Sequence, residues 1–244
     1  MFYIKKYKKF AKVQLQNRWK VPVIMTLIII VITSIFSIPD YINLYTNGVF
    51  TAIMDGDFSW ETLNILNEIP STYSTEQTFI VGILQLIIAE ILSLASLNVY
   101  IKMTRSPDKV SFSSFIEGFN NWGRAVLGIL WQLLWTWLWT ILFIIPGIIK
   151  YISYSQMFFI MAEFENVSVT KSMRISMIIT RGHKWDLFVM ALSFIGWQLL
   201  GIITLGISDI FVTPYIKLSF VNAYHGMLKE AIENGSLRPE DLSE

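Results

Sequence analysis

The chain contains six long runs of apolar residues separated by more polar segments. A helix that crosses the hydrocarbon core of a bilayer, about 30 Å thick, needs roughly 20 mostly apolar residues, and each run approaches that length. The pattern predicts an all-α fold, a polytopic membrane bundle of six transmembrane helices. The expected spans are residues 21–38, 78–101, 125–145, 147–162, 187–205 and 207–228.

Local signals set the expected ends of these spans. Pro39 stops the first, because proline cannot continue a helix. Residues 74–77 read Ser-Thr-Glu-Gln, a capping box that starts the second. Pro146 and Gly147 predict a sharp reversal between the third and fourth spans, so the second half of the chain consists of two tight hairpins.

The distribution of charge predicts the topology. Loops rich in Lys and Arg tend to stay in the cytoplasm. The basic residues gather in residues 1–20, 102–124, 163–186 and the tail 229–244, whereas the 39–77 loop has acids and no Lys or Arg. We therefore expect both termini in the cytoplasm (N-in, C-in), an acidic outer loop over 39–77, and residence in the bacterial cytoplasmic (plasma) membrane.

Composition narrows the class of protein. The chain is 54% hydrophobic and only 15% charged, where a soluble domain carries nearer a quarter of charged residues. A formal net charge of +1 gives no indication of a nucleic-acid partner. With no cysteine and two histidines, thiolate metal sites and Cys nucleophiles are excluded and a His-built metal centre is not expected. No catalytic, cofactor-binding or metal site is predicted.

Residues 1–20 predict a basic amphipathic interfacial helix. At 100° per residue, its apolar side chains share one face and its lysines the other, which is typical of a helix that lies on anionic lipid headgroups. The alternative is a basic flank that only sets orientation. Residues 111–119 and 168–182 each contain a short apolar stripe at helical spacing. These stripes either bind a partner protein or pack against the protein's own helical bundle.

The second half looks duplicated. Residues 131–134, Trp-Gln-Leu-Leu, recur at 197–200. Lys150 and Lys217 each precede a glutamate, Glu163 and Glu230, by the same thirteen residues. A true duplication would place two hairpins around a pseudo-twofold axis along the membrane normal, and chance similarity of Trp- and Leu-rich helices is the alternative.

A family resemblance rests on several stretches: Ser113-Ser114-Phe115 through Gly118-Phe119, residues 138–150 with Pro146-Gly147, Tyr154-Ser155, and Arg181-Gly182-His183-Lys184, followed by Phe194-Ile195-Gly196-Trp197 and Pro214-Tyr215. Over about residues 15–228 the chain resembles the bacterial integral-membrane family catalogued as domain of unknown function 975. The resemblance implies a six-span bacterial membrane protein, distantly similar to the membrane domain fused to some glycerophosphodiester phosphodiesterases. It implies no activity, substrate or catalytic residue.

Charged residues inside the predicted spans are candidates for function, because an ionised side chain at mid-bilayer is costly. Glu90 lies at the middle of the second span and Lys217 about halfway along the sixth, so the two form a candidate pair at similar depth. A protonated Glu90 bonded to a neighbouring Ser or Gln is the alternative. Lys150 either extends outward or reaches Asp209, and Gln85 completes a candidate polar pathway.

Residues 125–145 carry two ridges of side chains spaced four apart. One contains Trp131, Trp135 and Trp139, and the other contains Gly128, Gln132, Thr136 and Thr140. Small and hydroxyl residues allow close helix packing in lipid, so the second ridge is expected to be a packing face, and the tryptophans either pack or contact a lipid.

These features predict a non-enzymatic membrane protein, most simply an accessory or regulatory subunit that binds a membrane protein partner. The alternative is a transporter or permease for a small, peptide or lipid substrate that uses the polar residues of the spans as its pathway.

Overall fold

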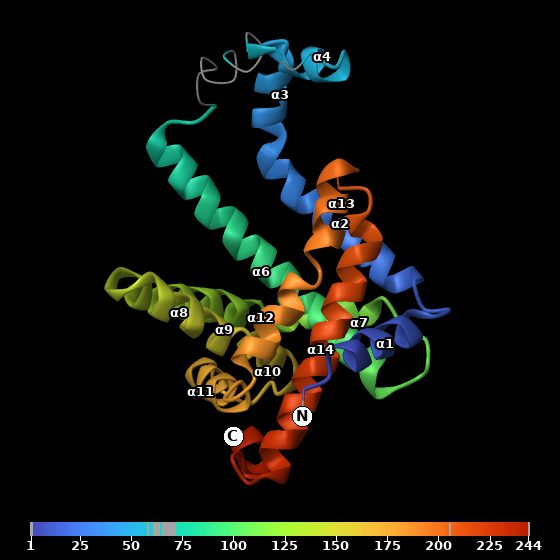
Figure 1. Cartoon of the computed structure of the whole chain (residues 1–244), viewed down its shortest axis with the longest axis vertical. Helices are drawn as coiled ribbons and strands as arrows, with labels where there is room; N and C mark the ends of the chain where they lie inside the picture. Colours follow the sequence, from blue (N-terminus) through green and yellow to red (C-terminus); the bar gives the residue numbers. More distant parts are fainter. Residues whose placement is uncertain (1, 58, 61–63, 65–71, 205, 244) are drawn as a thin grey trace. The chain divides into compact units, whose positions relative to one another are not determined.

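The computed structural model describes residues 2–57, 59–60, 64, 72–204 and 206–243, and its described regular structure is helical throughout. Part of the predicted outer loop, residues 58, 61–63 and 65–71, therefore lies outside the described residues. Figure 1 shows the helices in chain order. Their bounds are α1 Ile4–Leu15, α2 Lys20–Ser34, η1 Ile35–Ser37, α3 Ile38–Thr46, α4 Val49–Met54, α6 Thr75–Arg105, α7 Ser113–Glu117, η2 Gly118–Asn121, α8 Trp122–Leu142, α9 Ile144–Tyr154, α10 Met157–Glu163, α11 Val169–Ile179, α12 Lys184–Leu192, α13 Ile195–Ile203, α14 Asp209–Glu233 and η3 Pro239–Leu242.

Five helical segments of the described residues are long and apolar enough to cross a membrane. They are Lys20–Thr46, Thr75–Arg105, Ser113–Leu142, Ile144–Glu163 and Lys184–Ile203. The sixth predicted span corresponds to α14, which is 25 residues long, or about 38 Å, but is less apolar than the other five. Its C-terminal half is buried among other helices, and polar residues such as Asn222 and His225 lie along it.

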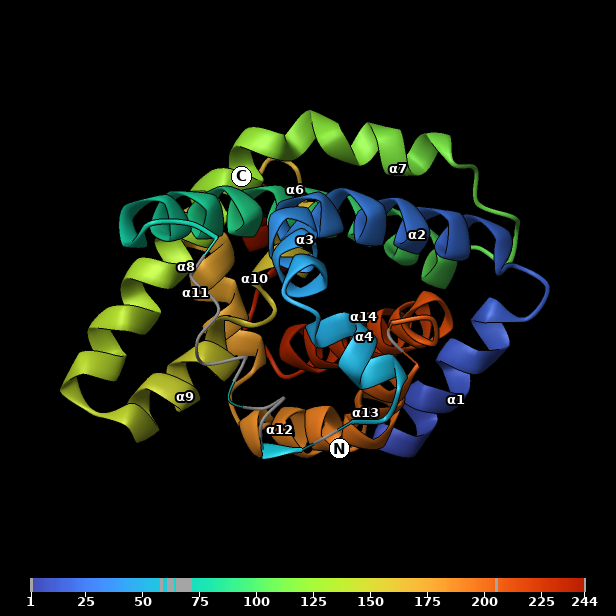
Figure 2. The ribbon, with the colours of Figure 1, turned by 90° about the horizontal axis from the view of Figure 1, so that it is seen from above.

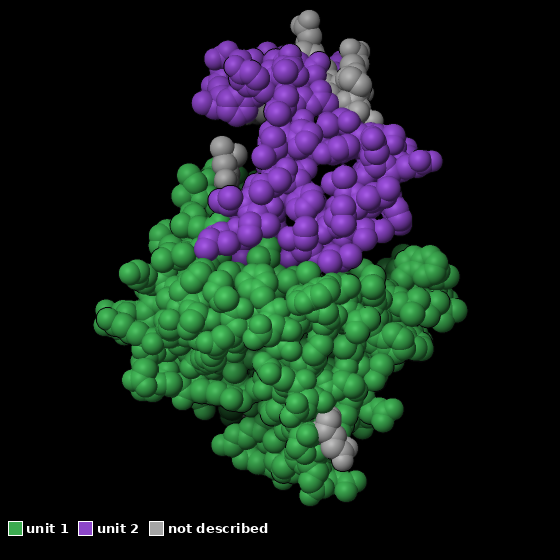
Figure 3. Space-filling model, turned by 180° about the vertical axis from the view of Figure 1, so that it is seen from behind, with its two compact units in different colours: residues 1–27, 90–244 green, residues 28–89 purple. Residues whose placement is uncertain are grey.

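The chain divides into two compact units, coloured separately in Figure 3. Unit 2 comprises residues 28–89, and unit 1 comprises residues 1–27 and 90–244. In unit 2, helix does not stop at Pro39 as predicted. A short 3₁₀ turn, η1, precedes α3, and Pro39 lies in the first turn of α3, where a missing amide hydrogen costs no helical bond. The start of α6 confirms the capping box: the Gln77 amide donates to Ser74 Oγ at 3.2 Å, and the Ser74 amide donates to Gln77 Oε1 at 3.0 Å.

The core of unit 1 surrounds the C-terminal half of α14. Tyr224 is fully buried there and stacks on Phe159 of α10, with ring centroids 5.5 Å apart. Met190 and Phe194 form a cluster with Ala223, against which residues of α1 pack. Because several helices share this one centre, the packing of α14 is largely with protein.

Two breaks in the helices of unit 1 have clear causes. The reversal after α8 occurs at Phe143, which has extended backbone angles, and Pro146 lies in the first turn of α9, so the predicted reversal at 146–147 is displaced by three residues. Between α9 and α10, the Ser176 hydroxyl of α11 accepts a bond from the Gln156 amide at 3.1 Å and donates one to the Ser153 carbonyl at 2.7 Å. These bonds satisfy backbone groups that the helix interruption would leave unpaired.

The two hairpins of unit 1 do not share one direction. In Figure 1, α8 and α9 run roughly horizontally, whereas α14 runs roughly vertically. Seen from above, α8 and α9 form a V (Figure 2). The predicted pseudo-twofold arrangement is therefore not found. The physical reason is their different packing: Gly128 of α8 lies against Met157 and Met161 of α10, whereas α13 packs along α14. Duplication of the sequence itself stays a prediction.

Candidate functional site

Two of the five predicted polar residues come together inside unit 1. Lys217 of α14 donates from Nζ to Ser93 Oγ of α6 at 2.9 Å. Glu90 lies one turn before Ser93 on the same helix, close enough for its charge to interact with that of Lys217. The structure therefore places Lys217 beside Ser93, which the sequence did not single out. The ion pairs of the described residues include none between Glu90 and Lys217, so their direct pairing stays a prediction.

Lys150 contacts an aromatic ring that the sequence did not single out as its neighbour. Its ammonium group lies 4.4 Å from the centre of the Trp139 ring, in a cation–π contact between α9 and α8. Asp209 begins α14, and its carboxylate packs against the backbone of Gly201 on α13. The ion pairs among the described residues include none between Lys150 and Asp209.

Gln85 belongs to unit 2, whereas the other four predicted residues belong to unit 1. Within unit 1, the two lysines inside the predicted spans make two separate local contacts, Lys217 with Ser93 and Lys150 with Trp139. The arrangement of these side chains fits local stabilisation of helix contacts in a low-dielectric region.

One nearly buried carboxylate of unit 1 belongs to a residue that sequence reasoning did not assign to a site. Glu163, at the end of α10, has a side chain only 4% exposed. It forms an ion pair with Arg105 at the end of α6, and its two carboxylate oxygens lie 3.2 and 3.3 Å from His225 Nε2 of α14. His225 Nδ1 lies 3.3 Å from the Thr104 hydroxyl. This cluster joins three helices that are distant in sequence.

The second histidine has a similar partner. His183, immediately before α12, lies 3.3 Å from Glu230 of α14 and 3.4 Å from Asp186. Both carboxylates here are partly exposed, 42% for Glu230 and 40% for Asp186. Each histidine of the chain thus contacts a glutamate that the predicted repeat places at equivalent positions, but only Glu163 is buried.

Arg124 fixes the start of α8 to the end of α10. Its guanidinium donates to the carbonyls of Met161 at 3.0 Å, Phe164 at 3.1 Å and Val167 at 2.5 Å. Met161 lies in the last turn of α10, Phe164 is the residue that follows the helix, and Val167 lies in the loop before α11, so the arginine caps the end of α10 and holds the loop after it. A basic residue that the sequence assigned only to topology therefore also stabilises the fold.

The N-terminal helix α1 contacts protein through the face that the sequence assigned to lipid. Ala11 and Leu15 are fully buried, and Tyr7 packs against Gly226 of α14, where any side chain would overlap the phenol. Burial raises the pKa of Tyr7, and the nearby charge of Glu230 acts in the same direction. The predicted apolar face therefore exists and packs partly against α14 through Tyr7, whereas Tyr3 and Phe10 are exposed.

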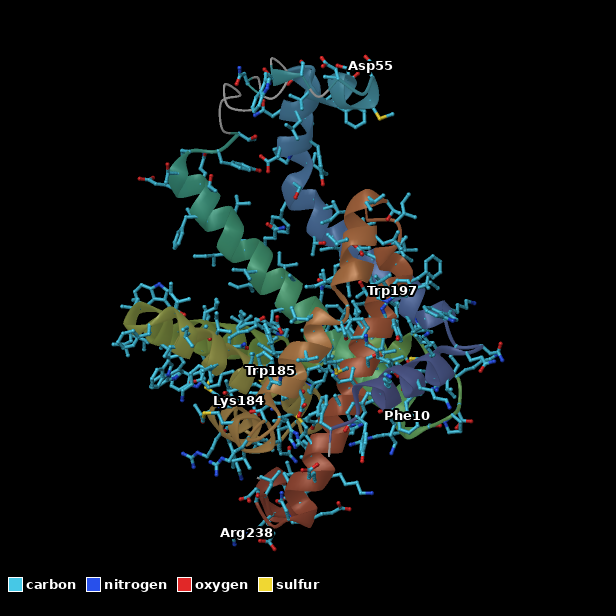
Figure 4. The ribbon with its side chains drawn as sticks, in the orientation of Figure 1. Phe10, Asp55, Lys184, Trp185, Trp197 and Arg238 are labelled. Carbon is cyan, nitrogen blue, oxygen red and sulfur yellow. The ribbon has the colours of Figure 1, made fainter. Side chains whose placement is uncertain are left out.

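A cleft of about 750 Å³ runs between α1 and α14. Tyr3, Tyr7 and Phe10 form the α1 side, and His225 and Lys229 lie on the α14 side. Phe10 is labelled in Figure 4. In unit 2, a smaller apolar pocket of about 410 Å³ lies between α3 and α4.

The amphipathic stripes of the two basic loops are used internally. Phe115 of α7 and Met173 of α11 are buried in unit 1, and Gly118 lies directly against the backbone of Ala95 on α6. This packing fits the expectation that these stripes rest under their own bundle.

Comparison with known families adds one finding. Residues 127–231 match the model of a known protein family. That family is the protein of unknown function DUF975. The match confirms the resemblance seen in the sequence and covers α8 from its second turn through most of α14. Comparison with curated proteins and with solved structures finds no match.

Proposed function

We propose that this protein is a non-enzymatic integral membrane protein of the bacterial cytoplasmic membrane, and that it acts as an accessory or regulatory subunit that binds a partner membrane protein. The DUF975 match and the five apolar helices support the membrane assignment. The partner-binding role rests on one surface of α8.

The six-span topology with both termini in the cytoplasm is part of this proposal. Contacts between helix ends support it. Tyr7 of α1 lies on Gly226, and Glu163, at the end of one candidate span, contacts both Arg105 at the end of another and His225 of α14. The N-terminal helix, the two span ends and the C-terminal half of α14 therefore lie close together within unit 1, on the side that we assign to the cytoplasm. An even number of crossings, with α14 as the sixth, is consistent with that gathering and with the basic residues found there.

The observation that carries the partner-binding role is a regular apolar stripe on the exposed surface of α8. Its five members are spaced alternately three and four residues apart, the a/d spacing with which one helix packs into another. All are substantially exposed in the described structure: Leu127, Leu130, Leu134, Trp137 and Ile141. The opposite side of α8 packs on α9 and α10, as Gly128 and Gln132 show by their burial.

A stripe of this spacing is suited to association with another helix in lipid. Apolar surface alone gives no driving force there, because lipid tails are equally apolar, so affinity comes from close interdigitation of side chains. Trp137, 64% exposed, supplies the large aromatic group that is enriched at the centre of protein interfaces.

Site-specific photo-crosslinking in intact cells tests this role. A photoreactive residue is introduced at Leu130 or Trp137 on the stripe and, as a matched control, at Ile203 of α13, which is also apolar and exposed. We expect one defined crosslinked protein from the two stripe positions and none from Ile203. Leu130→Ala combined with Trp137→Ala should abolish stoichiometric copurification of that protein. Equal crosslinking from Ile203, or copurification that survives the double substitution, would contradict the proposal.

A second candidate is transport of a small, peptide or lipid substrate, favoured by the buried proximity of Glu90 and Lys217. Purified protein in proteoliposomes tests it directly. Substrate flux that disappears with Glu90→Gln and survives Gln85→Ala would favour transport through unit 1. Flux that is absent, or unchanged by Glu90→Gln, counts against it.

A further inference from the structure

The cleft between α1 and α14 has two chemically different sides. Aromatic rings of α1, from Tyr3, Tyr7 and Phe10, form one side, and polar side chains of α14 form the other. Thr104 of α6 and His225 also line the cleft, where His225 is held by Glu163. Its volume of about 750 Å³ is within the range of small-molecule sites.

The bonds that build the cleft come from the two helices themselves. The Gln14 and Asn222 side chains exchange two hydrogen bonds, at 3.1 and 2.7 Å. The absent side chain of Gly226 admits the Tyr7 phenol. Because these contacts fix α1 against α14, the cleft is a feature of the packed structure.

Three lysines of α1 differ in what their side chains contact. Lys8 donates to the Ser193 carbonyl at 3.1 Å and lies 3.9 Å from the Phe194 ring, and Lys12 lies over Tyr215. Burial and the neighbouring Lys12 charge both lower the pKa of Lys8. Lys6 lies on the other side of the helix, lines the cleft and is 5.6 Å from the Phe10 ring.

The α14 side adds a second cation and two acids. Lys229 pairs with Glu233 at 3.7 Å in a solvent-exposed contact, and Glu230 contacts His183 at 3.3 Å. An exposed ion pair contributes little, so an anion that binds Lys229 displaces Glu233 at small cost. Lys6 and Lys229 are therefore two ammonium groups that line one cleft beside aromatic rings.

The position of the cleft along the chain matches the depth of lipid headgroups. One candidate span starts at Lys20, shortly after α1, and another ends at Arg105, next to the cleft residue Thr104. Tyrosine rings and lysines are typical of this interfacial region.

We propose that this cleft binds the phosphodiester headgroup of a membrane phospholipid, with Lys6 and Lys229 donating to the phosphate and the α1 aromatic rings packing on the glycerol and upper acyl chain. The proposal is independent of partner binding through α8. It differs from a general attraction of the basic helix to anionic lipid, because it assigns the affinity to two lysines of the cleft.

Binding is measured on the full-length protein in neutral detergent, as the rise in unfolding temperature with added phosphatidylglycerol, and as bound lipid in native mass spectrometry. The test variant is Lys6→Gln with Lys229→Gln. The matched control is Lys5→Gln with Lys9→Gln, which removes the same charge from exposed positions of α1 outside the cleft. We expect the test variant to weaken lipid binding at least tenfold and the control to stay within twofold of the unmodified protein.

Three results would overturn the proposal. Equal losses in both variants would show non-specific attraction to basic residues. Saturation by glycerol phosphate or inorganic phosphate at the same concentrations as the lipid would assign the cleft to a soluble phosphate ester. No stabilisation by any phosphodiester lipid would show that the cleft binds no headgroup. Both pairs of lysines are exposed, and circular dichroism without lipid verifies that each variant folds.

Discussion

The two hairpins of unit 1 contain the same four residues, Trp-Gln-Leu-Leu, in different surroundings. Gln132 of the first hairpin is 7% exposed and packs inside the protein, whereas Gln198 of the second is exposed. The difference arises because α8 lies against α10 at this level and α13 does not. An identical tetrapeptide therefore gives no information about which of its faces will be buried.

The two hairpins also differ in the burial of their equivalent glutamates. Glu163 is enclosed by Arg105 and His225, and Glu230 is partly exposed beside His183. Glu163 lies at the end of α10, where the C-terminal ends of two further helices meet, and Glu230 lies on the outer part of α14. Equivalent spacing in sequence has thus produced one buried and one partly exposed glutamate.

The largest expected difference between the hairpins is at these glutamates. Glu163→Gln leaves the buried end of His225 and the Arg105 charge without a carboxylate, and we expect it to lower the free energy of unfolding by about 2–3 kcal/mol. This is less than for a fully buried pair because Arg105 is 58% exposed. Glu230→Gln should cost no more than about 1 kcal/mol. Thermal unfolding in detergent compares the two, and equal costs would contradict the assigned burial.

The next difference concerns the two lysines. Lys217→Met removes the partner of Glu90 and Ser93, with an expected cost of about 2 kcal/mol, whereas Lys150→Met removes a cation–π contact worth about 0.5–1 kcal/mol. Adding Glu90→Gln to Lys217→Met should recover at least half of the loss, because no unpaired charge remains. A double variant as unstable as the sum of its parts would refute the pairing.

A smaller difference is expected at the glycines. A methyl group at Gly147 would lie 2.9 Å from Thr140 Cα, so Gly147→Ala should separate α8 from α9 and cost about 1–2 kcal/mol through overpacking. Gly196 of α13 has open space around it, and Gly196→Ala should be neutral or slightly stabilising. Unfolding in graded SDS measures both, and a destabilised Gly196→Ala would contradict the packing described.

The smallest difference is expected at the repeated glutamines. Gln132 Oε1 is buried without a hydrogen-bond partner in the described residues. Gln132→Leu removes that unpaired acceptor and should stabilise the protein by up to about 1 kcal/mol, whereas Gln198→Leu should have no measurable effect. If Gln132→Leu destabilised the protein, the Gln132 side chain would have a hydrogen-bond partner, in contradiction to its unpaired position in this structure.

Much of the fold follows from sequence because the signals are local. Apolar runs of about 20 residues, the Ser74 capping box and the charge bias of the loops depend only on neighbouring residues. Pro39 was misassigned because its effect depends on the preceding turn: the η1 turn allows helix to resume. Helix α14 is less apolar than the five candidate spans, and its C-terminal half packs against other helices. The sequence of α14 alone does not show that this half is covered by protein.

The candidate site was predicted less completely. Glu90 and Lys217 could be proposed as a pair because unusual charges in apolar spans are few, and the structure adds the Lys217–Ser93 hydrogen bond. Glu163, Arg105 and His225 could not, because each looks ordinary at the end of a span, and only the tertiary structure brings α6, α10 and α14 together. The only sequence signal for Glu163 was its place in the predicted repeat, thirteen residues after Lys150. That spacing does not indicate a binding or catalytic role.

The central proposal is that α1, the span ends at Arg105 and Glu163, and the C-terminal half of α14 face the cytoplasm, and that the acidic segment of residues 39–77 faces the outside. The chain has no cysteine, so single substitutions can be labelled without background. Lys9→Cys, Asp55→Cys and Arg238→Cys all lie at exposed positions, and the last two residues are labelled in Figure 4. With a membrane-impermeant maleimide, we predict labelling of Asp55→Cys in intact cells and of the other two only after permeabilisation. Labelling of either terminal position in intact cells, or protection of Asp55→Cys, would contradict this topology.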